Sequence, residues 1–143
     1  METLKNKKLL LACDVPIQKK VIEHVLHQFS NISIVNTEEK IKGLAKVFMS
    51  KPDLFVIAYE NPQSSLDFIT ALRNNADFKN ALIILILYSG INIFQRIKIG
   101  RLGIKDAFFL PLKQNDFGKI IKKYLEKDIE NAKKNLANRY TKT

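Results

Sequence analysis

Residues 51–62 read KPDLFVIAYENP, and this stretch decides the fold. Pro52 ends any helix that precedes it, because proline lacks a backbone N–H and restricts the residue before it. Leu54 to Ile57 is a continuous apolar run with β-branched and aromatic residues, which is typical of a strand buried on both faces. A short apolar strand between two helical segments predicts the central strand of a parallel sheet that is covered by helices on both sides.

The carboxyl end of this strand is where a functional side chain would be expected. In open parallel sheets, ligands and chemistry are found at the carboxyl ends of the strands, beside the point where the strand order reverses. Here that end is Ala58, whose methyl group offers no acid, base, nucleophile or metal ligand. The sequence therefore predicts a scaffold whose central position carries no chemistry.

The length and composition of the chain fit a single globular domain. The chain has 143 residues with a formal net charge of +10, a length that allows one core and leaves little room for a second. The longest apolar run, Ala81 to Tyr88, is much too short to span a bilayer. A single cysteine, Cys13, excludes an internal disulfide and fits a reducing compartment. We expect a cytoplasmic protein without a transmembrane segment or a signal peptide.

Apolar runs and helical stripes alternate five times along the chain. The expected strands cover residues 8–13, 32–35, 54–57, 81–88 and 107–110. The expected helices begin near Pro16, Glu38, Ser64 or Ser65, Ile93, and Asn115 or Asp116. Helical spacing places Ile17 on the inner face of the first helix, and Ala45 and Phe48 on that of the second. Right-handed crossovers then predict an α/β fold with a doubly wound, five-stranded parallel (βα)5 sheet, as in flavodoxin.

This order of segments resembles the response-regulator receiver (CheY-like) domains over residues 7–127. The resemblance depends on Lys51-Pro52-Asp53-Leu54 before the central strand, Ser89-Gly90 after the fourth strand, and Gly103 leading to Pro111. It implies a receiver-like domain over residues 1–127. Residues 128–143 would then form a basic C-terminal helical extension.

The resemblance also indicates which positions should carry chemistry. In receivers, two acidic residues after strand one and an aspartate at the end of strand three bind Mg²⁺, and that aspartate accepts a phosphoryl group. A Ser or Thr after strand four and a Lys before a proline contact the phosphoryl group. The matching positions are, in the same order, Cys13, Asp14, Ala58, Ser89 and Leu110. Only Asp14 and Ser89 fit the pattern, so the resemblance implies a degenerate phosphorylation site with no catalytic residue, metal or cofactor.

Several side chains near this site allow two interpretations. Asp14 is either a remaining metal ligand or, as we favour, a helix N-cap or turn residue. Cys13 is either a redox-sensitive thiol or, as favoured, a small strand residue. His24 and His27 have the spacing of a metal pair, but without a third ligand nearby we expect them to be exposed. Tyr59 should point to the face opposite Ala58, and Glu60 should point away from Asp14.

The last third of the chain carries most of the charge. Residues 91–143 contain 13 Lys and Arg against 5 Asp and Glu, which favours an anionic partner. In receivers, the fourth helix, fifth strand and fifth helix form the usual partner surface. An apolar stripe also continues past residue 127, and this helix either packs on its own domain or offers a contact surface. The candidate partner-binding residues are Arg96, Lys98, Arg101, Lys105, Lys122, Lys123, Ile129 and Leu136.

Two functional hypotheses follow. The first is a protein-interaction module in bacterial signal transduction that binds an acidic protein, with a second copy of the chain as an alternative partner through the C-terminal helix. The second is direct binding of nucleic acid, which is less favoured because the chain has no recognition-helix motif and its basic stretches contain few aromatic residues. Attachment to an anionic lipid surface is a weaker third option.

Overall fold

The computed structural model describes residues 6–38 and 40–126 of the chain. Five parallel strands form one sheet with the order β2-β1-β3-β4-β5. The strands are β1 (Lys7–Cys13), β2 (Ile32–Thr37), β3 (Leu54–Ala58), β4 (Leu82–Leu87) and β5 (Asp106–Phe109). This order confirms the predicted doubly wound α/β fold, with β3 in the centre.

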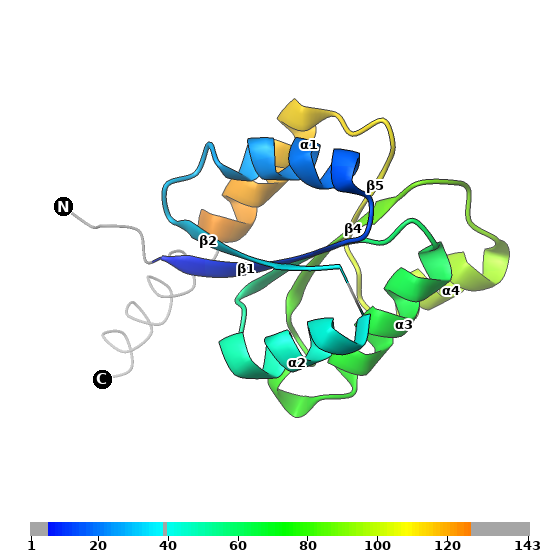
Figure 1. Cartoon of the computed structure of the whole chain (residues 1–143). Helices are drawn as coiled ribbons and strands as arrows, with labels where there is room; N and C mark the ends of the chain where they lie inside the picture. The colour runs from blue at the N-terminus through cyan, green and yellow to red at the C-terminus, as the bar shows by residue number, and fades with distance from the viewer. Residues whose placement is uncertain (1–5, 39, 127–143) are drawn as a thin grey trace, which may run out of the picture.

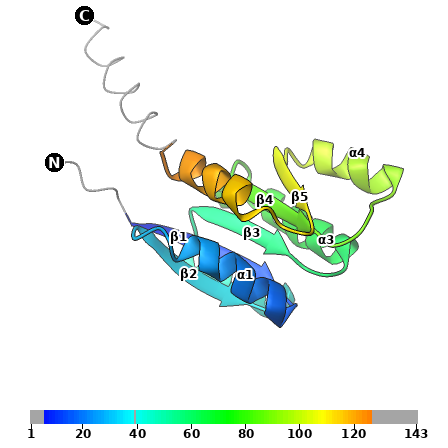
Figure 2. The same ribbon diagram turned by 90° about the horizontal axis from the view of Figure 1, so that it is seen from above.

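Helices cover both faces of the sheet (Figure 1). They are α1 (Pro16–Leu26), α2 (Lys40–Ser50), α3 (Pro62–Arg73), α4 (Ile93–Arg101), the short 3-10 helix η1 (Ala76–Phe78), and a C-terminal helix over residues 114–126. The C-terminal helix lies beside α1 on one face (Figures 1 and 2), and α2 and α3 lie on the other (Figure 1). Each strand therefore alternates between two separate apolar cores.

The stretch that precedes β3 holds the strand in register. The backbone N–H of Asp53 donates to the carbonyl of Lys8 at 2.8 Å, and the Asp53 carboxylate accepts the N–H of Lys8 at 3.0 Å. Lys51 adopts a left-handed φ of 48° where α2 ends before Pro52. All five residues of β3 are buried, as a central parallel strand requires. The Lys-Pro-Asp-Leu sequence thus ends one helix and aligns β3 with β1.

The two cores have different helical partners. Leu9, Leu11 and Val56 face α1 and the C-terminal helix, where Phe117 and Ile121 are fully buried. The strand residues that alternate with these, among them Leu10, Phe55 and Leu85, face α2 and α3. There they meet Val47, Leu66, Phe68, Ile69 and Leu72. Fully burying such side chains contributes roughly 1.5–3 kcal/mol each before entropy is counted.

Three local predictions were wrong. Ile17 is 73% exposed, and both Ala45 and Phe48 are exposed, since α2 turns Val47 towards the core instead. The helix predicted to begin near Ser64 or Ser65 begins earlier, at Pro62. The Asn61 side chain caps it by accepting the N–H of Gln63 at 2.9 Å, and proline is tolerated in the first turn of a helix.

The helix α4 is held mainly by its ends. No residue of α4 is fully buried. Asn92 and Gln95 form a reciprocal capping box, with the Asn92 side chain accepting the N–H of Gln95 at 2.8 Å and the Gln95 side chain accepting the N–H of Asn92 at 3.0 Å. At the other end, Gly103 follows with a φ of 70°, a conformation that glycine adopts without strain. Well-formed caps therefore compensate for the small buried area of this helix.

Within residues 6–38 and 40–126, no helix is long and apolar enough to cross a membrane. The predicted extension over residues 128–143, with the candidate contact residues Ile129 and Leu136, lies outside the described residues. The division of the chain at residue 127 therefore stays a prediction.

Candidate functional site

Cys13 and Ala58 lie opposite each other at the carboxyl ends of β1 and β3. The register pairs the two residues directly, and both side chains belong to the core beneath α1 and the C-terminal helix. Their exposed fractions are 1% and 0%. The structure thus brings together the two positions at which the resemblance places a metal-binding acid and a phosphoacceptor, and both side chains are small and uncharged.

Tyr88 follows β4 at this end of the sheet, and its contact with Cys13 was not predicted from the sequence. Its phenol oxygen lies 3.5 Å from the Cys13 Sγ. Burial, and secondly the contact with Cys13, raise the pKa of the Tyr88 phenol above its usual value. The strand alternation of Ile84, Ile86 and Tyr88 on one face was a signal that could have found it.

Ser89 is one residue further along and exposed. Among the hydrogen bonds found within the described residues, none uses the Ser89 hydroxyl. Because successive residues of an extended segment point to opposite sides, Tyr88 rather than Ser89 contacts Cys13. The assignment of Ser89 to the hydroxyl position of the site stays a prediction.

Asp14 binds the loop that follows β3. Its Oδ1 accepts the backbone N–H of Glu60 at 2.9 Å. The residue before α1 that acts as N-cap is Val15, and no side chain caps this helix. Of the favoured interpretation of Asp14 as a helix N-cap or turn residue, the N-cap alternative was therefore wrong. The carboxylate instead links the end of β1 to the loop after β3, and the Glu60 side chain is exposed to solvent.

Tyr59 lies on the opposite face of the sheet, as predicted. Its ring belongs to the core beneath α2 and α3 and meets Phe68 edge-on at a centroid distance of 5.8 Å. Within the part of the chain that the structure describes, the Tyr59 hydroxyl is buried without a hydrogen-bond partner, and burial is the main reason that its pKa is raised. The phenol of Tyr59 therefore stays protonated, and its ring acts as a core side chain.

Leu110 fills the position at which the resemblance expects a lysine. It is half-buried against the core formed with Cys13 and Ala58. Its backbone N–H donates to the carbonyl of Leu87 at 3.0 Å, and its bond to Pro111 is cis. An apolar side chain here packs well but supplies no positive charge for a phosphoryl group.

This end of the sheet offers few side chains that could act as a nucleophile or bind a metal ion. Burial raises the pKa of the Cys13 thiol, so the thiol rather than the reactive thiolate predominates at neutral pH. No cluster of three His, Cys, Asp or Glu side chains suited to a metal ion occurs in the part of the chain that the structure describes. His24 and His27 are exposed, as expected. Asp14 follows Cys13 directly, and one carboxylate supplies fewer oxygen ligands than Mg²⁺ normally needs.

A second candidate surface lies on α4. Ile93, Phe94 and Ile97 expose 67%, 78% and 47% of their surface. Arg96 and Arg101 are exposed on the same helix, and Lys98 is half-buried. Phe109 adds an exposed aromatic side chain on the edge strand β5. The structure therefore surrounds exposed apolar groups with basic ones, a combination that the sequence analysis recognised only in its charge.

The other predicted contact residues are spread around this surface. Lys105 is exposed just before β5, and Lys122 and Lys123 are exposed on the C-terminal helix. Lys123 and Lys105 both line one cavity together with Arg101.

Comparison with known proteins finds similarity to solved structures of receiver domains. No protein-family model matches the chain, and no curated protein sequence matches it. The signal receiver domain of a putative LuxO repressor from Vibrio parahaemolyticus has a TM-score of 0.74 and 16% identity, covering 89% of this chain and 96% of that one.

Two further receivers show the same likeness. A signal receiver domain of a two-component histidine kinase from Clostridium thermocellum has a TM-score of 0.71 and 15% identity, covering 85% of this chain and 98% of that one. The chemotaxis protein CheY4 of Vibrio cholerae has a TM-score of 0.68 and 14% identity, covering 82% and 98%. Strand order, helical layers and these neighbours agree, so this chain has the fold of the response-regulator receiver (CheY-like) domains.

Proposed function

We propose that the protein is a pseudo-receiver, a receiver-like interaction module that does not accept a phosphoryl group and that acts in bacterial signal transduction. The observation that carries the proposal is the uncharged Cys13–Ala58 pair, fully buried at the carboxyl ends of β1 and β3. Phosphoryl transfer to an aspartate needs the carboxylate itself, a divalent cation and positive charge around the transferred group. None of these is supplied by Ala58, by the single carboxylate of Asp14, or by Leu110.

Incubation with acetyl phosphate and Mg²⁺ should therefore leave the protein without an acid-labile phosphate adduct. Intact mass spectrometry at neutral pH and after acid treatment measures this, with a receiver domain that retains the strand-three aspartate as the positive control. Acetylation of lysines, which acetyl phosphate also causes, is distinguished by its different mass and its acid stability. An acid-labile phosphate adduct on this chain would disprove the proposal.

The contact surface that we propose is α4 with β5 and the C-terminal helix. The exposed side chains of Ile93, Phe94 and Ile97 supply apolar contact area, and aromatic residues and arginine are enriched at protein interfaces. Arg96, Lys98 and Arg101 surround them, which favours a partner with an acidic surface. Pairing of this surface with itself would bring like charges together, so an acidic partner fits better than a second copy of the chain.

Substitution of Phe94→Ser, Ile97→Ser and Lys98→Glu together should abolish capture of that partner, with affinity at least about tenfold weaker because the apolar centre is lost. Affinity capture from the native cell, followed by quantitative mass spectrometry, identifies proteins that bind the wild type and not the variant. The matched control is Ile17→Ser with Lys20→Glu, which changes an exposed apolar and an exposed basic side chain on α1. Equal capture by the α4 variant and the wild type would reject this surface.

A further inference from the structure

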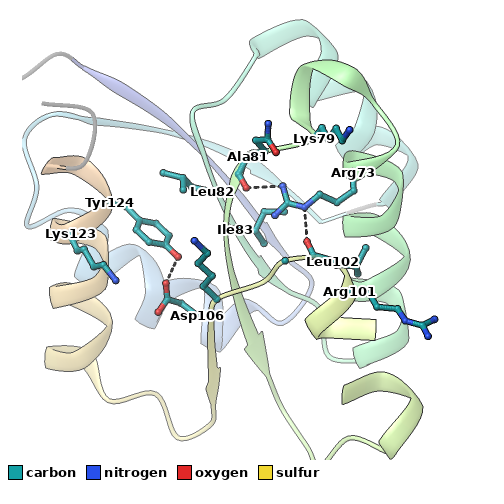
Figure 3. A pocket seen from close by; sticks show the side chains of 13 residues that line it. Arg73, Lys79, Ala81, Leu82, Ile83, Arg101, Leu102, Asp106, Lys123 and Tyr124 are labelled. Carbon is teal, nitrogen blue, oxygen red and sulfur yellow. Dashed lines mark hydrogen bonds between the residues drawn. The ribbon is translucent and has the colours of Figure 1, made fainter. Parts of the chain in front are cut away.

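A cavity of about 520 Å³ lies at the end of the sheet opposite Cys13 and Ala58. Arg73 at the end of α3 forms one wall, and residues 79–83 form the floor leading into β4. The end of α4 and the loop to β5 close it on another side, and Lys123 and Tyr124 contribute from the C-terminal helix (Figure 3). Its volume falls within the range of small-molecule sites, which is roughly 300–1,000 Å³.

The register of the sheet explains why space remains here. β4 begins at Leu82, whereas the first residue of β5, Asp106, pairs with Ile84. Leu82 and Ile83 therefore have no partner on the β5 side, although Leu82 and Ile83 pair with β3 on their other side. The chain between α4 and β5 passes around this gap. Backbone atoms as well as side chains therefore line the cavity.

The walls carry an excess of positive charge. Five basic side chains line the cavity against the single carboxylate of Asp106; they are Arg73, Lys79, Arg101, Lys105 and Lys123. The Asp106 carboxylate accepts a hydrogen bond from the Tyr124 hydroxyl. No ion pair was found between any of these five cations and a carboxylate of residues 6–38 or 40–126. Like charges that converge on one concave site create a positive potential there, which attracts anions.

Arg73 is the fixed member of this group. Its Nε donates to the Leu102 carbonyl at 2.8 Å, and its Nη1 donates to the carbonyls of Ala81 at 2.8 Å and Phe78 at 3.2 Å. Figure 3 shows the guanidinium between Ala81 and Leu102, facing the cavity. Burial lowers the pKa of this guanidinium from its usual value, yet arginine remains charged in proteins. The three carbonyls hold a positive charge in place before any anion arrives.

Apart from Asn80, the uncharged side chains of the lining are apolar or aromatic. Leu82, Ile83 and Leu102 line the cavity with the ring of Tyr124. A simple phosphate ion would occupy only a small part of this volume and would leave the apolar surface without a partner. A ligand that matches the whole cavity combines a multiply charged anionic group with a flat or apolar body.

We propose that this cavity binds a phosphorylated small molecule of nucleotide size, with the polyphosphate among the basic side chains and the ring against Leu82, Leu102 and Tyr124. Guanidinium and ammonium groups form charge-assisted hydrogen bonds with phosphate oxygens. The Nη2 group of Arg73, which makes none of the three hydrogen bonds to carbonyls, is available for such contacts. The site is distinct from the surface of α4, β5 and the C-terminal helix proposed for protein contact, although Arg101, Lys105 and Lys123 border both. Lys79 belongs to the cavity without lying on that surface.

Isothermal titration calorimetry of the full chain with ATP tests the proposal, with inorganic triphosphate and adenosine as partial probes. We expect ATP to bind more tightly than either part, because it uses both the basic and the apolar lining. Lys79→Gln with Lys123→Gln should weaken ATP binding at least about tenfold. Lys20→Gln with Lys119→Gln changes the net charge equally at exposed positions outside the cavity and should leave ATP binding unchanged.

Amide NMR of the same complex locates the ligand. The N–H signal of Gly103, which lines the cavity, should shift on addition of ATP, whereas that of Gly90 at the far end of β4 should not. Absence of ATP binding at millimolar concentration would overturn the proposal, as would equal weakening by both double variants. Tighter binding of a single-stranded oligonucleotide that displaces ATP would assign the cavity to nucleic acid and also overturn it. Partner capture by a Lys79→Gln variant, which changes a cavity residue outside α4, β5 and the C-terminal helix, should match the wild type, so failure here leaves the proposed function standing.

Discussion

Replacement of Arg73 by methionine should lower the free energy of unfolding by about 3 kcal/mol, because the carbonyls of Leu102, Ala81 and Phe78 would lose their donor. Hydrogen bonds from a charged donor contribute more than neutral ones, and methionine keeps much of the aliphatic packing. Urea denaturation followed by circular dichroism measures the loss. The change should exceed that of most surface substitutions.

Arg96→Met is the matched control for this prediction. Arg96 is exposed on α4, and its side chain makes no hydrogen bond or ion pair that was found with residues 6–38 or 40–126, so its replacement should change the stability by less than about 0.5 kcal/mol. Because Arg73 also joins α3 to the end of α4, hydrogen exchange in α4 should accelerate in the Arg73→Met protein. Equal stability of the two variants would show that the three carbonyl contacts contribute little.

Ala58→Asp should destabilise the protein by about 3 kcal/mol at neutral pH and should not restore phosphorylation. The new carboxylate would be fully buried beside Cys13 and near the charge of Asp14, without a cation to balance it. One new carboxylate also leaves Cys13 and Leu110 unchanged, so the metal ligand and the lysine would still be missing. Chemical denaturation and intact mass after treatment with acetyl phosphate test the two parts.

The destabilisation by Ala58→Asp should depend on pH, in a direction set by the pKa of the new carboxyl group. Burial and Asp14 would raise the pKa of the introduced carboxyl in the folded state above its unfolded value, so the folded state would bind the proton more readily. The destabilisation should therefore be largest above the raised pKa and should shrink as the pH falls towards the unfolded pKa. Ala76→Asp at an exposed position is the control, and its effect should be small. A destabilisation by Ala58→Asp that does not depend on pH would contradict the argument.

The sequence predicted the architecture well because the strong signals are local. The apolar run of β3, the proline before it and the five alternating segments were sufficient for the doubly wound sheet. It was harder to predict which face of each helix is buried, as the exposed side chains of Ile17 and Phe48 show. Short helices with many apolar residues permit more than one inner face, and the packing of the sheet selects among them.

The functional features that the sequence did not reveal are those that tertiary contacts create. Tyr88 contacts Cys13 across 75 positions of the chain, and Arg73 gives no sequence signal of its three carbonyl partners. The cavity depends on the two-residue offset between β4 and β5 and on side chains from four separate segments. Neither composition nor periodicity contains this information.

The buried, uncharged Cys13–Ala58 pair has a consequence for control in the cell. On the proposed function, phosphorylation at this end of the sheet does not turn the α4 surface on or off, so phosphoryl transfer and hydrolysis do not set how long that surface stays active. The fraction of partner that is bound then follows mass action between the amounts of the two proteins and their dissociation constant. Synthesis and degradation of this chain would set the strength of its output.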